Sequence, residues 1–190
     1  NMKYLQIFSH IITCLVEGEF MQMEDVYRID QGIERYMTKT QKKTADFMEG
    51  CMELGGLLGG WSESEIVELK KYGHALGMAF QITDDIMDYR ETTETTGKPV
   101  GNDLREGLLT YPLLSIVNDD NKDRLLTDIK SLNNGGNEQD IIDYVIAQGG
   151  IDNTLAVADK YCKDALAALA AVRDFPGKEF LVMAVENLAD

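Results

Sequence analysis

Apolar residues recur every three or four positions along nearly the whole chain, a spacing that gathers them on one face of an α-helix. The three longest stretches with this pattern are residues 2–24, 39–60 and 62–91. No alternating run of β-branched residues, of the kind that forms strands, stands out. The pattern therefore predicts an all-α protein. Shorter helical stretches follow at Tyr111–Asn118, Lys122–Leu132, Glu138–Gln148, Ile151–Val172 and Lys178–Leu188.

Local chemistry sets the expected ends of these helices. Ser62 precedes the third long stretch and Glu65 follows three residues later, which is the pattern of a capping box. We expect Gly18 to interrupt the first helix, and the glycine-rich segment 55–60 to end the second. No low-complexity linker or internal repeat separates the stretches, and the chain length suits one hydrophobic core. We therefore expect a single domain over residues 1–190.

Acidic residues outnumber basic ones by 33 to 18, which gives a formal net charge of −15. This balance disfavours binding to nucleic acid or to anionic membranes, because both recruit patches of Lys and Arg. No apolar run approaches the roughly 20 residues that a membrane-spanning helix needs, so stable membrane insertion is not expected. The charge is compatible with an acidic site for divalent cations.

Three cysteines and two histidines are further candidates for metal binding. Cys14, Cys51 and Cys162 are odd in number and far apart in the sequence. We therefore expect reduced, buried thiols in a cytoplasmic protein rather than disulfides or a zinc site. We expect no acid or cysteine at ligand spacing from His10 or His74, and neither lies in a Glu-x-x-His pattern, which disfavours a ferritin-like di-metal centre. We expect both histidines to be structural.

A polar stripe interrupts the apolar second half of the third long helix. Gln81, Asp84, Asp85 and Asp88 have the i, i+3, i+4, i+7 spacing that places side chains on one helix face. Three ionised carboxylates within two turns repel one another, and burying them without cations costs on the order of several kcal/mol each. Alone, the pattern is more often a solvated acidic patch than a Mg²⁺ site. Mg²⁺ takes one or two carboxylates and shares phosphate oxygens.

Two lysines are candidate partners of such a site. Lys98 lies in the polar loop "GKPVGND", ten residues after Asp88, and Lys43 precedes Thr44 on a neighbouring helix. Each lysine alone suits an ordinary surface position. Around one cavity with metal ions, however, the lysines complete a diphosphate site, in which cations bridge the phosphate oxygens and lysines neutralise the remaining charge.

Several blocks of the sequence resemble the trans-polyprenyl (isoprenyl) diphosphate synthases, and together they extend over essentially the whole chain. The blocks "YGHALGMAFQITDDIMDY" and "TGKPVGNDLREG" are highly specific to that family. The resemblance implies the isoprenoid-synthase fold, a bundle of long helices around a central cavity. The other matching blocks are "EGEFMQ" at 17–22, Tyr36 followed by "KKTADFMEGCMELGGLLGG" (Tyr36 through Gly60), "TYPLL" at 110–114 and "GGIDNTLAVADKYCKDAL" at 149–166.

The resemblance also implies a metal site. In the family, two aspartate-rich motifs face each other and bind Mg²⁺ ions together with an allylic diphosphate. The stretch "DDIMD" matches the second of these motifs. Asp84 and Asp88 are therefore the implied metal ligands, and Asp85 supports them.

The substrate contacts follow from the same resemblance. Lys43 and Lys98 match lysines that hold the allylic diphosphate, and Phe80 matches an aromatic residue near isopentenyl diphosphate. Thr44 and Gln81 match polar residues beside the forming cation. The implied reaction is ionisation of the allylic diphosphate, attack by isopentenyl diphosphate and loss of a proton.

Two departures from the family pattern affect what we expect of this chain. The matching blocks do not include the first aspartate-rich motif or the basic residues that bind isopentenyl diphosphate, and the chain begins with Asn1 rather than Met. We therefore expect the C-terminal portion of a longer protein, which is inactive by itself. Leu108 stands where many members carry another diphosphate-binding lysine. That lysine is often lacking in heptaprenyl-type synthases, so the change favours a medium or long all-trans product.

Two alternative functions are open at this stage. One is a farnesyl or geranylgeranyl diphosphate synthase, and the other is a non-catalytic subunit that completes a partner synthase. Retention of the three aspartates and of Lys43 and Lys98 disfavours the second. The family implies a homodimer or heterodimer, and the apolar first helix is the candidate interface.

Overall fold

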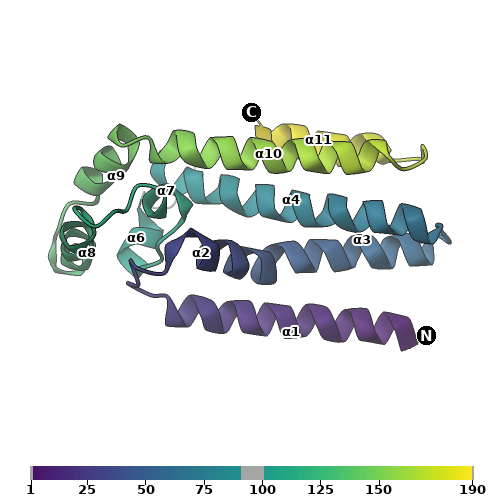
Figure 1. Cartoon of the computed structure of the whole chain (residues 1–190), viewed down its shortest axis with the longest axis horizontal. Coiled ribbons are helices and arrows are strands. Elements are labelled where there is room, and N and C mark those ends of the chain that lie inside the picture. The colour runs from purple at the N-terminus through teal and green to yellow at the C-terminus, as the bar shows by residue number, and fades with distance from the viewer. Residues whose placement is uncertain (1, 91–100, 190) are drawn as a thin grey trace. The chain divides into compact units, whose positions relative to one another are not determined.

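The computed structural model describes residues 2–90 and 101–189, and every regular element within those ranges is a helix or helical turn (Figure 1). The predicted all-α class is therefore confirmed. The first five elements are α1 (Met2–Glu24), α2 (Gly32–Thr40), the π-helical turn η1 (Gln41–Ala45), α3 (Asp46–Leu58) and α4 (Glu63–Arg90). The later elements are α6 (Asn102–Glu106), α7 (Tyr111–Leu114), α8 (Lys122–Ser131), the 3-10 turn η2 (Leu132–Asn134), α9 (Glu138–Ala147), α10 (Gly150–Ala170) and α11 (Lys178–Ala189).

The capping box predicted before α4 is present. The Ser62 backbone N–H donates to the Glu65 carboxylate at 3.1 Å, and the Glu65 N–H lies 3.4 Å from the Ser62 hydroxyl oxygen. These reciprocal bonds satisfy amide groups that the first turn of a helix leaves without partners.

Helical structure before η1 begins earlier than the sequence pattern indicated. We expected it to begin at residue 39, but α2 already begins at Gly32. Ile33, Tyr36 and Met37 form a short apolar face of α2, and charged neighbours obscure it in the sequence.

The expectation that Gly18 interrupts the first helix is wrong. Helix α1 runs through this position, and Gly18 is buried. A Cβ atom at Gly18 would lie 2.9 Å from the backbone nitrogen of Lys43 in η1. The glycine therefore permits a close approach of two backbones instead of ending a helix.

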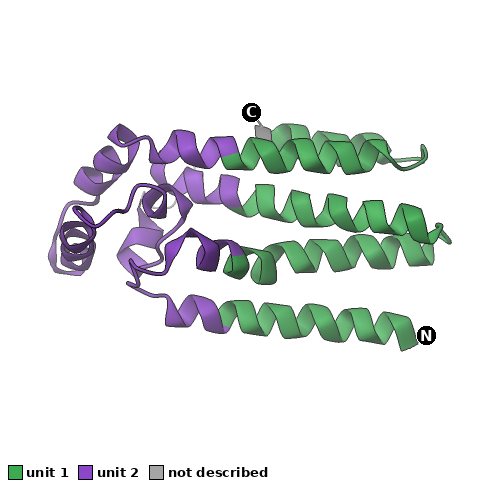
Figure 2. Cartoon of the chain, in the orientation of Figure 1, with its two compact units in different colours: residues 1–19, 38–81, 157–190 green, residues 20–37, 82–156 purple. Residues whose placement is uncertain are grey.

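The chain forms two compact units (Figure 2). Unit 1 contains residues 1–19, 38–81 and 157–190, and unit 2 contains residues 20–37 and 82–156. The boundaries fall inside α1, α2, α4 and α10, so each of these helices contributes residues to both units.

In unit 1, α4, α10 and α11 share one apolar cluster. Small residues alternate there with larger ones, which lets the helices pack closely. At one end of α4, the rings of Trp61 and Phe175 meet edge to face, with centroids 4.9 Å apart. The buried members of the cluster are Leu69, Tyr72, Ala75, Ala79, Cys162, Ala165, Ala168, Leu169, Val172 and Val185.

Two glycines on α4 bring it against η1 and α3 in the same unit. A Cβ atom at Gly77 would lie 2.6 Å from the Cα of Ala45, and one at Gly73 would lie 2.7 Å from the carbonyl oxygen of Met48. Both distances are shorter than van der Waals contact, so only glycine fits at these positions. Gly73 and Gly77 are four residues apart, about one helical turn, so both lie on the same face of α4.

In unit 2, hydrogen bonds of Tyr27 connect the segment after α1 to the C-terminal end of α6. The Tyr27 backbone N–H donates to the Gly107 carbonyl at 2.8 Å, and its hydroxyl donates to the Arg105 carbonyl at 3.1 Å. Tyr27 itself has a positive φ of 57°, a conformation that needs such support in a residue with a bulky side chain. Buried apolar residues of this unit include Leu104, Leu109, Leu113, Leu125, Ile129, Ile142 and Val145.

The three cysteines are free thiols, but one of them is not buried. Cys14 and Cys162 are buried as expected, whereas Cys51 is exposed. The prediction of burial rested on the apolar residues around Cys51 in the sequence. Phe47 and Leu58, on the same side of α3, are also exposed, so this side of the helix is not covered. Among the described residues, no helix has the length and apolarity that a membrane span requires.

The close approach at Gly77 generates a stability prediction. Gly77→Ala forces a methyl group against the Ala45 backbone, and we expect it to lower the free energy of unfolding by about 1–3 kcal/mol. Gly55→Ala is the matched control, because a Cβ atom there meets nothing within 4 Å. We expect this exposed helical substitution to raise stability by about 0.5–1 kcal/mol. Urea unfolding followed by circular dichroism measures both, and equal effects of the two substitutions would contradict the packing described.

Candidate functional site

The segment that carries Lys43 and Thr44 is a π-helical turn between two α-helices. Helical backbone angles continue on both sides of it, at Thr40 and at Asp46. A π-helical turn inserts an extra residue into a helix and shifts the directions of its side chains. Such turns are rare and frequently mark functional sites.

In unit 1, two helices pack closely against this turn. Gly18 of α1 lies against the backbone of Lys43, and Gly77 of α4 lies against Ala45. Since neither contact has room for a side chain, the two helices hold the turn closely between their backbones.

One turn after Gly77, α4 presents Gln81 to the π-turn. The Thr44 hydroxyl donates to the Gln81 side-chain carbonyl oxygen at 3.1 Å. Both residues are only half-buried, and the neighbouring Phe80 is 45% exposed. The structure therefore brings Thr44 and Gln81 together, as expected for two residues of one site.

Lys43 forms an ion pair that the sequence reasoning did not single out. Its ammonium lies 3.0 Å from the carboxylate of Glu19 on α1, and the two side chains are 34% and 56% exposed. Exposed ion pairs of this kind contribute about 0–1 kcal/mol. Glu19 therefore holds the Lys43 ammonium only weakly.

In unit 2, the three aspartates of α4 lie in different environments. Asp84 is exposed, Asp88 is half-buried and Asp85 is only 4% exposed. The buried Asp85 carboxylate accepts a hydrogen bond of 2.5 Å from the hydroxyl of Tyr36 on α2. Tyr36 is itself held edge to face against Tyr111, with ring centroids 5.6 Å apart. Asp85 is thus fixed inside the protein next to the outward-facing Asp84.

Asp88 connects α4 to the beginning of α6. Its two carboxylate oxygens accept hydrogen bonds from the backbone N–H groups of Asn102 at 3.0 Å and Asp103 at 3.2 Å. Burial raises the pKa of Asp88, these N–H donors lower it, and the negative charge of Asp84 raises it further. The net direction is upward, because burial outweighs the two N–H donors.

The remaining predicted residues have less structural support. Lys98 lies outside the described residues. Leu108, which replaces the usual lysine, is half-buried, and its backbone N–H donates to the Asp103 carbonyl at 2.8 Å.

Two residues of the site were not predicted. Nothing in the local sequence pairs Tyr36 with Asp85, because 49 residues separate them. Glu19, by contrast, lies inside the family-like block "EGEFMQ" and was detectable.

A second DDxxD pattern occurs at Asp119–Asp123. Here the acids are exposed, and Asp119 pairs with Lys122 at 2.9 Å. The Asn121 side chain closes the turn, since it accepts from the Asn118 N–H at 2.8 Å and donates to the Ile116 carbonyl at 2.9 Å. These are contacts of a turn followed by a helix start, and no buried carboxylate is involved.

Comparison with known proteins gives a consistent assignment. A family model described as polyprenyl synthetase matches residues 1–148. The heptaprenyl diphosphate synthase component 2 of Geobacillus stearothermophilus is 32% identical over 166 residues, which cover 87% of this chain and 52% of that protein. The octaprenyl diphosphate synthase of Escherichia coli strain K12 is 33% identical over 186 residues, which cover 96% of this chain and 57% of that protein.

Solved structures agree with the sequence relatives. The polyprenyl synthase from Caulobacter crescentus CB15, complexed with calcium and isoprenyl diphosphate, has a TM-score of 0.87 and 30% identity. The heptaprenyl diphosphate synthase of Staphylococcus aureus has a TM-score of 0.87 and 28% identity. Each alignment covers 100% of this chain and 60% of the solved chain.

This chain spans a little over half the length of the relatives that it matches, 52% and 57% for the two described above. Within that span, the matches confirm the family that the sequence blocks predicted and the all-α isoprenoid-synthase fold class. The chain belongs to the polyprenyl synthetase family.

Proposed function

We propose that the complete protein is a Mg²⁺-dependent trans-prenyltransferase that condenses an allylic diphosphate with isopentenyl diphosphate and makes a medium- or long-chain all-trans polyprenyl diphosphate. The observation that carries this proposal is the arrangement of the α4 aspartates, in which a buried, tyrosine-bound Asp85 lies beside the exposed Asp84. The names of the two sequence relatives, a heptaprenyl and an octaprenyl diphosphate synthase, support the product class.

The carboxylates of α4 fit a hard divalent cation. Asp84 presents exposed oxygens, and burial together with the charge of Asp84 raises the pKa of Asp88, so a bound cation offsets both effects. Mg²⁺ prefers one or two carboxylates, waters and phosphate oxygens as ligands, which Asp84 and Asp88 with a diphosphate supply. When bound, the cation neutralises charge that develops on the departing diphosphate. In this proposal Asp85 does not coordinate the cation; it positions the neighbouring aspartates.

Other residues of the chain bind and orient the substrates. Lys43 exchanges its weak pairing with Glu19 for a diphosphate, which carries more negative charge. Lys98 is proposed for the same task from the sequence resemblance alone. The oxygens of Thr44 and Gln81 face positive charge in the allylic cation, and such oriented dipoles stabilise it without reorganisation. The exposed ring of Phe80 contributes an apolar surface for isopentenyl diphosphate.

A second chain is the proposed partner, and the exposed face of α1 is its proposed contact. Leu5, Phe8, Ile12 and Val16 recur along one side of this helix and are 65%, 56%, 57% and 49% exposed. Contiguous apolar surface of this kind marks interaction sites in most proteins. The relative named as a synthase "component 2" supports a heterodimer, and a homodimer is the alternative.

The first prediction concerns catalysis. The protein expressed from its complete gene is incubated with farnesyl diphosphate, labelled isopentenyl diphosphate and Mg²⁺, and products are separated by chain length. We expect products longer than geranylgeranyl diphosphate, and we expect Asp84→Ala to lower kcat/KM by at least about 100-fold because a transition-state charge contact is lost. Asp119→Ala is the matched control, since it alters the other DDxxD pattern at an exposed turn, and full activity is expected.

Three outcomes of this assay would each overturn part of the proposal. A lack of any prenyl product would contradict the enzymatic function. Products no longer than geranylgeranyl diphosphate would favour the short-chain alternative. Normal turnover in a partner complex that contains Asp84→Ala would assign the chain to a non-catalytic subunit. The 190-residue chain assayed alone is expected to form no product.

The second prediction concerns the support of the aspartates. Tyr36→Phe removes the hydroxyl that donates to the buried Asp85 carboxylate, and we expect a loss of about 1–3 kcal/mol in unfolding free energy. We also expect half-maximal activity to need more Mg²⁺, because the neighbouring ligands lose their fixed position. Tyr111→Phe keeps the aromatic contact and serves as the control. Equal Mg²⁺ requirements in both variants would contradict a positioning role for Tyr36.

The third prediction concerns assembly. The double substitution Phe8→Glu and Ile12→Glu places two charges in the exposed apolar face of α1, and we expect it to convert a dimer into monomers. Thr13→Glu adds a charge one position outside that face and is expected to leave the dimer intact. Light scattering coupled to size-exclusion chromatography measures the mass. A monomeric parent protein, or a double variant that remains dimeric, would exclude this face as the interface.

A further inference from the structure

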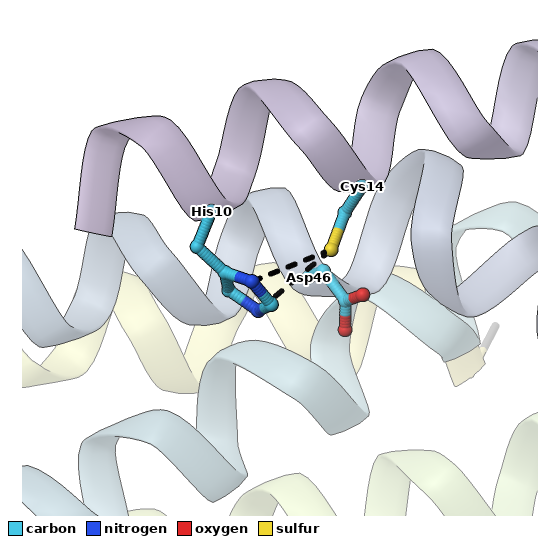
Figure 3. A group of neighbouring side chains, drawn as sticks. All are labelled: His10, Cys14 and Asp46. Atoms are coloured by element: carbon cyan, nitrogen blue, oxygen red, sulfur yellow. Dashed lines mark hydrogen bonds between the residues drawn. The ribbon is translucent and has the colours of Figure 1, made fainter. Parts of the chain in front are cut away.

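A cluster of metal-ligand side chains lies in unit 1, outside the residues assigned to the prenyl-transfer site. His10 and Cys14 are one turn apart on α1, and Asp46 is the first residue of α3. One ligand atom from each residue lies within 4.8 Å of the others. Figure 3 shows the three side chains gathered between the two helices.

The sequence analysis gave His10 a structural role, and the structure places it beside two further side chains of metal-ligand type. The expectation that His10 has no cysteine at ligand spacing is wrong, because Cys14 follows it four residues later on the same helix face. Asp46 joins them through tertiary structure, because α1 and α3 pack closely in this unit. A Cβ atom at Gly50, one turn after Asp46, would clash with the side chain of Ile11.

The separation of Cys14 and His10 is close to that of two ligands in a tetrahedral zinc site. The Cys14 sulfur lies 3.8 Å from Nδ1 and 3.7 Å from Nε2 of His10. Zinc bonds of ~2.3 Å to sulfur and ~2.0–2.1 Å to nitrogen place the two ligand atoms roughly 3.5 Å apart. The two side chains are therefore spaced to share one ion.

Solvent and ions can reach the cluster. His10 and Asp46 line a cavity of about 290 Å³, together with Glu49 and Lys70. His10 is exposed and Asp46 half-buried, whereas Cys14 is only 4% exposed. The site is thus open on its histidine side, where a water molecule can complete the coordination.

A second group in the same unit shares Asp46 but is less suited to a metal ion. It consists of Asp46, Glu49 and His74. Glu49 is already paired with His74 at 3.5 Å and with the ammonium of Lys70 at 3.4 Å. This group also lacks a thiolate.

The chemistry of the ligands selects the metal. Thiolate and imidazole are ligands for zinc and related transition metals, and they do not suit Mg²⁺ or Ca²⁺, which take oxygen ligands. We propose that His10, Cys14 and Asp46 bind one zinc-type ion, with water as the fourth ligand. The ion joins α1 to α3 directly after the π-turn that carries Lys43 and Thr44, and its binding stabilises that junction. The site is independent of the proposed prenyl-transfer activity.

Cobalt(II) titration of the reduced, metal-free chain tests the proposal. Cobalt replaces zinc in such sites, and we expect a sulfur-to-cobalt charge-transfer band together with intense visible bands typical of tetrahedral cobalt, both abolished by added Zn²⁺. Cys14→Ser is expected to remove the charge-transfer band. His10→Ala, at an exposed position that does not disturb the core, is expected to weaken Zn²⁺ binding by at least about 100-fold, beyond the 10–100-fold effect of losing an outer contact.

Three controls separate this site from other ligands in the chain. Cys51→Ser removes the exposed thiol, Cys162→Ser removes the other buried thiol, and His74→Ala removes the histidine of the second group. All three variants are expected to retain the band and the zinc affinity. The proposal is overturned if the parent chain gives no charge-transfer band, if the band survives in Cys14→Ser, or if His74→Ala weakens binding as much as His10→Ala does.

Discussion

Contact between the backbones of α4 and the π-turn is the constraint on which the arrangement of unit 1 depends. Gly77 meets Ala45 with no room for a side chain, and Gly18 of α1 meets Lys43 in the same way. Because these contacts fix the turn, the hydrogen bond between Thr44 and Gln81 forms one helical turn after Gly77, and Lys43 comes within reach of Glu19. A looser contact would leave the same side chains without a common geometry.

Charge is the second constraint, and it acts in unit 2. Asp85 is buried and bound by Tyr36, Asp88 binds the backbone at the start of α6, and Asp84 remains exposed. The same DDxxD pattern at Asp119–Asp123 has exposed acids, an ordinary lysine partner and a turn closed by asparagine. The spacing of acids alone therefore does not distinguish a candidate metal site from a helix start. Burial and fixed hydrogen-bond partners do distinguish the two. They hold the carboxylates in place, and a bound cation offsets the free energy lost when those carboxylates leave water.

Most helices were predictable because periodicity and capping are local properties. The apolar pattern gave the bounds of α1 and nearly those of α4, and the capping box at Ser62 formed as expected. The family blocks identified the polar residues of the candidate site. What the sequence could not provide were contacts between distant segments: the role of Gly18 against Lys43, the bond from Tyr36 to Asp85, and the approach of Asp46 to His10 and Cys14. Exposure of Cys51 was missed for the same reason, since neighbours in sequence do not reveal which side of a helix is covered.

The central claim is that the α4 aspartates bind a diphosphate through divalent cations, and equilibrium binding tests it most directly. The dissociation constant of farnesyl diphosphate is measured by titration calorimetry on the protein from the complete gene, with Mg²⁺ and with a chelator. The account predicts binding at least about tenfold tighter with Mg²⁺, a difference of roughly 1.4 kcal/mol, and loss of that difference in Asp84→Ala. Equal affinity with and without Mg²⁺, or a difference that persists in Asp84→Ala, would contradict it.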